Sequence, residues 1–232
     1  MGSTRLPGKV LEDLGGMSVL AWVLRGVRAA RLVDEVVVAT STDPRDDVVA
    51  RAARELGVAV VRGSEEDVLS RFLVALDQHP ADAVVRVTAD CPFVDPDLVD
   101  ALVGAWRGVP GLDYVSTVLV RTLPHGLDVE LVTAQALRRV DRLATGPDRV
   151  HVTSGVYTRP DDFAVMGLSF TPDASDIRVT LDTPEDLHML RAVVAARGSS
   201  LPSRAELVAL LRERPELVAL NASVRQKTLA EG

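Results

Sequence analysis

The sequence predicts an α/β fold in which a mostly parallel, mixed sheet is flanked by helices. The first observation is a set of short valine-rich runs without polar alternation, which is typical of strands covered on both faces. The second is that amphipathic stretches of helical period lie between these runs. The first half of the chain therefore alternates strand and helix as a doubly wound sheet does.

The elements follow in chain order. Four buried parallel strands are predicted at residues 36–39, 58–61, 83–87 and 114–117, and helices at about 17–29, 45–56, 65–78 and 96–107. The second half is less regular, with strands predicted near 128–131, 163–169 and 177–181 and helices near 133–144, 184–197, 203–213 and 215–221. Ser203 after Pro202, with Glu206 three residues later, is a capping-box pattern that marks a helix start.

The length of 232 residues suits one domain with one substantial core. We expect a nucleotide-binding half at about 1–110, an acceptor-binding and metal-completing half at about 111–200, and C-terminal helices at 203–222. No repeat or low-complexity linker interrupts the sequence.

The net charge of −7 argues against binding to nucleic acid or to an anionic membrane, because either partner would be repelled. An anionic ligand must therefore be met by local positive charges. The single cysteine, Cys91, allows no intramolecular disulfide, and no apolar run approaches the ~18 residues of a membrane helix. A cytoplasmic location is expected.

The N-terminal segment Gly2-Ser3-Thr4-Arg5-Leu6-Pro7-Gly8-Lys9 combines small residues, hydroxyls and two cations just before a helical stretch. Such a loop can offer backbone N–H groups and positive charge to phosphates. An ordinary turn with solvated cations explains the octapeptide equally well when it is taken alone.

Two acidic residues follow buried runs. Asp90 comes just past the run 83–87, and Asp182 follows the run 177–181 before a helix that begins with Thr183 and Pro184. Ligands of open α/β sheets bind at the carboxyl ends of the strands, and carboxylates there suit Mg²⁺. Asp90 has an alternative role as the cap of a turn before Pro92.

These three segments together resemble the cytidylyltransferases that make CMP-activated acidic sugars. The likeness is to the SpsF-like branch of spore-coat polysaccharide biosynthesis, related to CMP-Kdo and CMP-acylneuraminate synthetases. It extends over nearly the whole chain, through residues 39–43, 62–69 with Arg71, 126–130, 151–153 and 221–227.

The resemblance implies a Rossmann-like nucleotide-diphospho-sugar transferase fold and a set of site residues. It implies that Gly2, Ser3, Arg5 and Lys9 hold the nucleoside triphosphate and that Asp90 and Asp182 hold Mg²⁺, with Arg5, Lys9, Asp90 and Asp182 as the catalytic set. Thr40, Asp43, Arg62 and Gly63 would line the nucleotide pocket. Arg86, Glu130 and His151 would face the acceptor.

The activity implied is transfer of CMP from CTP, or of a nucleotide from another NTP, to a small anionic acceptor with release of pyrophosphate. A nucleotide-sugar-dependent glycosyltransferase of similar fold and a non-catalytic truncated homologue are the alternatives. A homodimer is left open, and Val150, where the SpsF-like pattern has a glutamate before His151, leaves the acceptor chemistry open.

One departure concerns the sheet. In the family the glycine loop follows a buried central strand, whereas this sequence begins with the loop itself. The strands ending at Ala39 and Val87 are therefore expected to lack a common neighbour, and buried backbone groups need partners. We expect either that the natural start lies upstream of Met1 or that another segment fills the gap.

Overall fold

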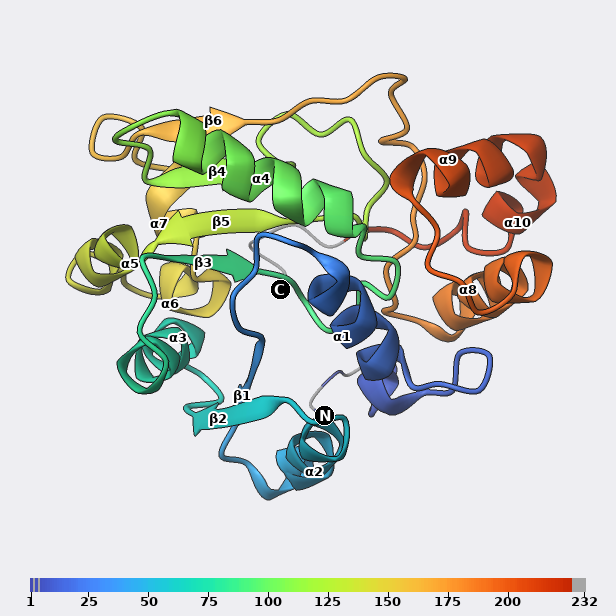
Figure 1. Cartoon of the computed structure of the whole chain (residues 1–232). Helices are drawn as coiled ribbons and strands as arrows, with labels where there is room; N and C mark the ends of the chain where they lie inside the picture. Colours follow the sequence, from blue (N-terminus) through green and yellow to red (C-terminus); the bar gives the residue numbers. More distant parts are fainter. Residues whose placement is uncertain (2, 4, 227–232) are drawn as a thin grey trace.

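The computed structural model describes residues 1, 3 and 5–226, and Figure 1 shows its α/β arrangement. Gly2, which was predicted to bind the nucleotide, lies outside the described residues. Within the described part, no helix combines the length and the apolarity needed to cross a membrane. The strands are β1 Val37–Ser41, β2 Ala59–Gly63, β3 Ala83–Arg86, β4 Tyr114–Ser116, β5 Glu130–Thr133 and β6 Val165–Gly167.

The helices of the first half match the predicted ones to within a few residues: α1 Val19–Ala29, α2 Asp47–Glu55, α3 Val68–Gln78 and α4 Pro96–Gly108. Those of the second half are α5 Ala134–Asp141, α8 Pro184–Arg197, α9 Arg204–Glu213 and α10 Pro215–Ala219. The sequence did not predict α6 Pro147–His151 and α7 Ser154–Tyr157, because helices this short carry little periodicity. Two short 3-10 helices, η1 Lys9–Leu11 and η2 Pro44–Asp46, complete the set.

The helix starts follow from local side-chain chemistry. The Ser18 hydroxyl accepts from the backbone N–H of Ala21 at the start of α1, and Asp95 caps α4 ahead of Pro96. The predicted capping box of Ser203 and Glu206 at α9 is confirmed. Such interactions satisfy free N–H groups in the first turns of α1, α4 and α9, which is why the sequence located these helix starts well.

The strands form two sheets. β1 and β2 pair in parallel, and a second sheet has the order β3-β5-β4-β6. Within the second sheet β5 runs antiparallel to both β3 and β4, whereas β4 and β6 are parallel. The prediction of a mixed sheet is confirmed. The strands at residues 83–87 and 114–117 were expected in a mostly parallel arrangement, but the antiparallel strand β5 lies between β3 and β4.

β4 and β5 separate two hydrophobic cores, because neighbouring residues of a strand point to opposite faces. Val115 and Leu131 join a core built with α1, α4, α8 and α9. Tyr114 and Val132 join a second core, with α3, α5 and α7, and a third cluster lies between α1, α2 and the β1-β2 sheet. The sheet thus has helices on both faces, as the sequence predicted.

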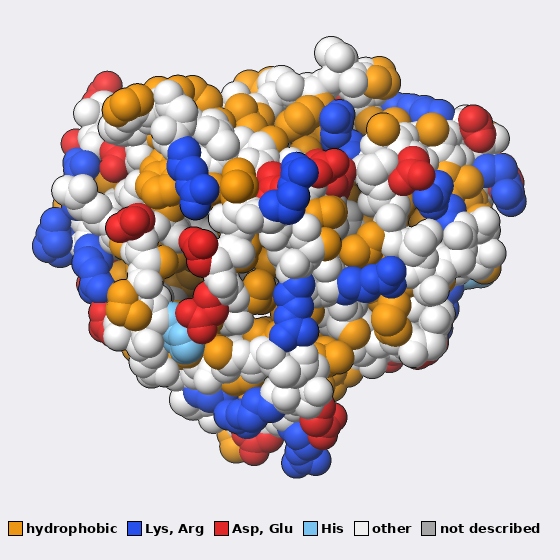
Figure 2. Space-filling model, viewed as in Figure 1, with side chains coloured by type: hydrophobic (Ala, Val, Ile, Leu, Met, Phe, Trp, Pro, Cys, Tyr) orange, Lys and Arg blue, Asp and Glu red, His pale blue; other side chains and the backbone are white. Residues whose placement is uncertain are grey.

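β1 and β3 belong to different sheets, and no strand of the described residues pairs with the edges that they turn toward each other. A cavity of about 710 Å³ lies between them, lined by residues 36–39 and 83–89 and by side chains from α1, α3 and α4. Figure 2 shows the surface hollowed left of centre, with hydrophobic side chains inside the hollow. The expectation that these two strands lack a common neighbour is confirmed for the described part of the chain.

Residues 177–181 were predicted as a strand, and this prediction is wrong. The segment makes only an isolated bridge, between Arg178 and His125. The His125 N–H donates to Ile177 O (2.9 Å) and the Val179 N–H donates to His125 O (2.7 Å). A Cβ at Gly126 would lie 2.6 Å from the Thr180 nitrogen, so only glycine permits this approach. The turn at residues 125–126 offers too few backbone groups to extend the pairing.

Candidate active site

The N-terminal loop folds against the carboxyl ends of the strands. Gly8 has a positive φ of 76° and starts the 3-10 helix that carries Lys9. The Leu6 N–H donates to the Ser3 hydroxyl (3.3 Å), which closes the loop on itself. The loop presents Arg5 toward Asp182 and Lys9 toward Asp90 and Asp182.

Asp90 and the segment that carries Asp182 lie side by side. The Leu181 N–H donates to Asp90 O (2.9 Å), and the Thr180 hydroxyl donates to the same oxygen (3.2 Å). These backbone contacts bring together two carboxylates that are far apart in the sequence. Both carboxylates lie near the carboxyl end of β3, and the carboxyl ends of strands are where ligands of α/β folds bind.

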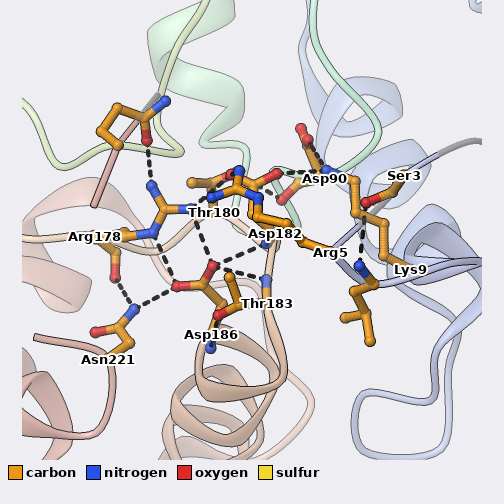
Figure 3. Close-up of polar contacts among 12 residues, drawn as sticks. Ser3, Arg5, Lys9, Asp90, Arg178, Thr180, Asp182, Thr183, Asp186 and Asn221 are labelled. Carbon is orange, nitrogen blue, oxygen red and sulfur yellow. Dashed lines mark hydrogen bonds and ion pairs between the residues drawn. The ribbon is translucent and has the colours of Figure 1, made fainter. Parts of the chain in front are cut away.

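Lys9 joins the two carboxylates (Figure 3). Its Nζ lies 2.5 Å from Asp90 Oδ2 and 2.7 Å from Asp182 Oδ1. Arg5 adds an ion pair of 3.1 Å to Asp182 Oδ2. The side chains of Lys9, Asp90 and Asp182 are only 15%, 23% and 16% exposed, so these charges interact in a partly dry environment.

The pKa values follow from this arrangement. Burial alone would raise the pKa of Asp182, but Lys9, Arg178 and Arg5 outweigh it and lower that pKa to about 2. Burial alone would lower the pKa of Lys9, yet Asp90 and Asp182 hold it above the ordinary lysine value. At neutral pH Asp182 and Lys9 therefore both carry their charge.

The predicted nucleotide-lining residues gather at the carboxyl ends of β1 and β2. Arg62 donates to the backbone oxygens of Ser41 and Asp43 and pairs with Asp47 at 2.9 Å. Arg45 hydrogen-bonds to Asp43 and lowers the pKa of that carboxyl to about 2. These contacts fix the segment that follows β1.

Two further predicted residues have structural partners of their own. The Thr40 hydroxyl donates to Asp46 Oδ2 (2.8 Å). Asp46, which the sequence did not single out, also accepts from the Ser41 N–H and hydroxyl. A Cβ at Gly63 would lie 3.0 Å from the Arg71 side chain, so glycine allows α3 to approach β2.

Of the residues predicted to face the acceptor, the structure brings Arg86 and Glu130 together. Glu130 is 6% exposed and accepts a short hydrogen bond from Arg86, one of 2.5 Å from the Tyr114 hydroxyl and one of 2.7 Å from the Thr153 hydroxyl. Tyr114 and Thr153 were not predicted as site residues. Tyr114 was read as part of a strand and Thr153 lay in the quoted stretch 151–153, so no separate signal set them apart.

His151 ends α6, and its backbone is part of a strained turn. Val152 has a φ of 63° and is fully buried, and the Thr153 N–H donates to His151 O (2.6 Å). A β-branched residue at positive φ is costly and persists only where the surroundings enforce it. The turn connects His151 to the Glu130 cluster through Thr153, whose hydroxyl donates to Glu130.

A polar hollow of about 390 Å³ adjoins the Asp182 loop. It is lined by Arg5, Thr183, Glu185 and residues 223–225. The C-terminal segment thus reaches the predicted phosphate loop, which the sequence indicated only through its likeness at residues 221–227.

The donor set fits a hard divalent cation that keeps water and substrate oxygens. Among residues 1, 3 and 5–226, no cluster of three or more His, Cys, Asp or Glu residues could hold a metal ion. Asp90 and Asp182 nevertheless converge on one ammonium nitrogen, so a single cation contacts an oxygen of each. Two carboxylates plus substrate phosphates is a typical Mg²⁺ environment, whereas a closed zinc site would need four protein ligands.

Comparison with known proteins identifies the class. The sequence model described as cytidylyltransferase matches residues 1–201. The spore coat polysaccharide biosynthesis protein SpsF of Bacillus subtilis is 34% identical over 93% of this chain and 92% of its own. The 3-deoxy-manno-octulosonate cytidylyltransferase of Anaeromyxobacter dehalogenans is 30% identical over 84% of this chain and 94% of its own.

Solved structures of other proteins show the same fold. A cytidylyltransferase from Leptospira borgpetersenii superposes with a TM-score of 0.92 at 29% identity, over 97% of this chain and 95% of its own. At 19% identity, a CMP:2-keto-3-deoxy-manno-octonic acid synthetase complexed with CTP (TM-score 0.66; 84% and 95% covered) shares the fold. So does Rv0371C of Mycobacterium tuberculosis in complex with manganese (TM-score 0.57; 82% and 94% covered).

Fold and relatives thus define a nucleotidyltransferase. More narrowly, the chain belongs to the cytidylyltransferase family.

Proposed function

We propose that this protein transfers CMP from CTP to an acidic sugar or a related anionic acceptor and releases pyrophosphate. The observation that carries the proposal is the cluster in which Lys9 contacts both Asp90 and Asp182 beside Arg5, at the carboxyl edge of the sheet. A nucleoside triphosphate bound at this edge would need cations to offset its negative charge and carboxylates to hold its metal ion. The cluster contains both.

Ser3, Arg5 and Lys9 contact the triphosphate in this proposal, and Thr40, Asp43, Arg62 and Gly63 line the rest of the nucleotide site. The support is positional, since all of them lie at the strand ends or in the loop facing them. The net charge of −7 adds a second argument, because a polyanion then has to be attracted by local cations. Arg5 and Lys9 provide these.

Asp90 and Asp182 would hold Mg²⁺. Both are carboxylates, they converge on one cation, and a distant protein of the same fold has been solved with manganese. When bound, the ion supplies charge neutralisation for the phosphates. Lys9 would then exchange part of its contact with the carboxylates for contact with phosphate oxygens.

Arg86, Glu130 and His151 would form the acceptor side. Glu130 accepts a hydrogen bond from Arg86 and so fixes the Arg86 guanidinium. An arginine held in this way suits a carboxylate, phosphate or phosphonate of the acceptor. The strained Val152 turn supports a functional role for the segment that carries His151.

In the reaction, an acceptor oxygen attacks the α-phosphorus of CTP in line. The new P–O bond forms as the bond between the α-phosphorus and the bridging oxygen breaks, and pyrophosphate leaves with the bonding electrons. Arg5 and Lys9 stabilise the charge that develops on the leaving group. A hydroxyl acceptor releases its proton to water, whereas an ionised phosphate or phosphonate has none to lose.

The biological setting proposed is polysaccharide, glycan or secondary-metabolite biosynthesis, as the name of the Bacillus subtilis relative suggests. A cytoplasmic location and a homodimer stay predictions.

The test is pyrophosphate release from a panel of NTPs combined with acidic sugars and phosphonates. We expect release with CTP and at least one anionic acceptor, and its loss in Asp182→Asn. Consumption of a nucleotide sugar without pyrophosphate release would instead favour a glycosyltransferase. Binding of CTP without turnover on any acceptor would favour a non-catalytic homologue.

A further inference from the structure

Arg178 lies directly behind Asp182 and contacts two carboxylates at once (Figure 3). Its Nη2 is 2.6 Å from Asp182 Oδ2 and 3.0 Å from Asp186 Oδ2, and its Nε is 2.9 Å from Asp186 Oδ1. Asp186 is fully buried and Arg178 is 8% exposed. This guanidinium is therefore turned toward the protein interior, whereas Arg5 and Lys9 come from the loop that faces the ligand.

Asp186 also fixes the backbone that carries Asp182. One of its oxygens, Oδ2, accepts from the N–H groups of Asp182 (2.9 Å) and Thr183 (3.1 Å). Arg178 and Asp186 together thus hold both the main chain and the carboxylate of Asp182. A buried arginine that is already held by one carboxylate cannot move with a second one. Arg178 therefore constrains the position of the Asp182 carboxylate.

The C-terminal segment holds Arg178 in turn. Asn221, which is 3% exposed, donates from Nδ2 to Asp186 Oδ1 (2.9 Å) and to Arg178 O (3.2 Å). The side-chain oxygen of Gln226 accepts a short hydrogen bond from Arg178 Nη1. Two residues beyond α10 therefore clamp an arginine that lies more than 40 positions earlier in the chain.

We propose that Arg178 is a positioning residue that fixes the Asp182 carboxylate for metal binding, and that Asn221 and Gln226 keep Arg178 in place. The inference rests on the proposed function of Asp182 as a metal ligand. It makes Asn221 and Gln226 a part of the site, whereas the metal itself is held by Asp90 and Asp182 in this proposal.

Arginine and lysine separate position from charge at this site. A lysine keeps the positive charge, but it lacks the planar guanidinium with which Arg178 contacts Asp182 and Asp186 at the same time. Because Arg178→Lys keeps the positive charge beside Asp182, a loss of metal affinity in this variant reports lost position and not lost charge.

The experiment measures Mn²⁺ binding to the nucleotide-free protein by electron paramagnetic resonance, together with kcat, KM for CTP and thermal unfolding. For Arg178→Lys we expect Mn²⁺ affinity to fall about 10- to 100-fold, the range for losing an outer contact to a metal ligand, with a fall in kcat. Asn221→Ala should shift both quantities in the same direction by less. Arg138→Lys, which alters a half-exposed pair with Asp77, is the matched control and should change neither.

A melting temperature lowered in Arg178→Lys with unchanged Mn²⁺ affinity and kcat would overturn the proposal and make Arg178 merely structural. Wild-type protein that binds no Mn²⁺ would overturn it as well. If Mn²⁺ affinity falls as expected but wild-type protein releases no pyrophosphate, the proposed function fails and the positioning role stands.

Discussion

Two charged clusters on the same sheet are built in opposite ways. In the first cluster Lys9 lies in η1, Asp90 follows β3 and Asp182 precedes α8, and the three side chains are 15–23% exposed. In the second, Glu130, Arg86 and Tyr114 lie on strands, and Glu130 is only 6% exposed and bonded to Arg86 and two hydroxyls. The first can exchange partners with an incoming polyanion and metal, whereas the second is internally satisfied and preorganised.

The residues of the first cluster should therefore act in the chemistry, and those of the second should set the geometry of the site. Charges that exchange partners on binding contribute where charge develops in the transition state. Buried and fully paired groups contribute by fixing their neighbours, and breaking one pair leaves the others unpaired. Substitutions in the two clusters should therefore separate in their kinetic effects.

The largest expected effect is loss of turnover in Asp182→Asn or Asp90→Asn. Each removes a carboxylate from the proposed metal site, and we expect kcat to fall at least about 1000-fold with the fold intact. Pyrophosphate release and circular dichroism check this. Asp97→Asn, on an 80% exposed carboxylate of α4, is the control. Activity within a few-fold of wild type would remove either residue from the metal site.

Lys9→Ala should lower kcat/KM for CTP by ~2–4 kcal/mol of transition-state stabilisation, or about 30- to 900-fold. It also leaves two carboxylates facing each other, so the variant's melting temperature should rise more on adding Mg²⁺ than that of wild type. Lys9→Arg keeps the charge and serves as the comparison. A change confined to the KM of the acceptor would place Lys9 in the other subsite.

Glu130→Gln should act on the acceptor side alone. The amide places a donor against Arg86 and loses the charge that orients it, so we expect the KM for the acceptor to rise about 10-fold or more while the KM for CTP is unchanged. Thr153→Ser retains the hydroxyl donor and should behave like wild type. Equal effects on both KM values would show that the two clusters do not serve separate substrates.

The smallest expected effects concern stability against pH. The pKa of Asp182 is lowered to about 2, so its stabilisation of roughly 2 kcal/mol is present above pH ~4 and is lost as the pH falls through about 2. Burial and Glu130 raise the pKa of Tyr114 above its ordinary value of 10.0, so its contribution is present below pH 10 and is lost as the pH rises further.

Urea unfolding of chelator-treated protein across pH checks these signs. Asp182→Asn should flatten the acid limb of the stability curve and Tyr114→Phe the alkaline limb. If each variant changed the opposite limb, the proposed origin of both pKa shifts would be wrong.

The helix starts and the Asp90 and Asp182 turns could be predicted because their signals are local. Ser203 and Glu206 cap α9 through neighbours within three residues, and Pro184 after Thr183 does the same at α8. The segment 177–181 was mistaken for a strand because its apolar run matches one, while its actual neighbours are turns. Apolar periodicity reports burial, and burial alone does not reveal the pairing partner.

Acidic residues after buried runs, and a loop rich in small residues and cations before the first helix, are visible in the sequence alone. The antiparallel insertion of β5 between β3 and β4, the contact of Lys9 with a carboxylate 173 residues away and the support of Arg178 by Asn221 emerge only when the chain is folded. Local patterns fix elements because capping and periodicity act within a few residues. Contacts between distant segments depend on how the elements pack, and no short stretch of sequence carries that information.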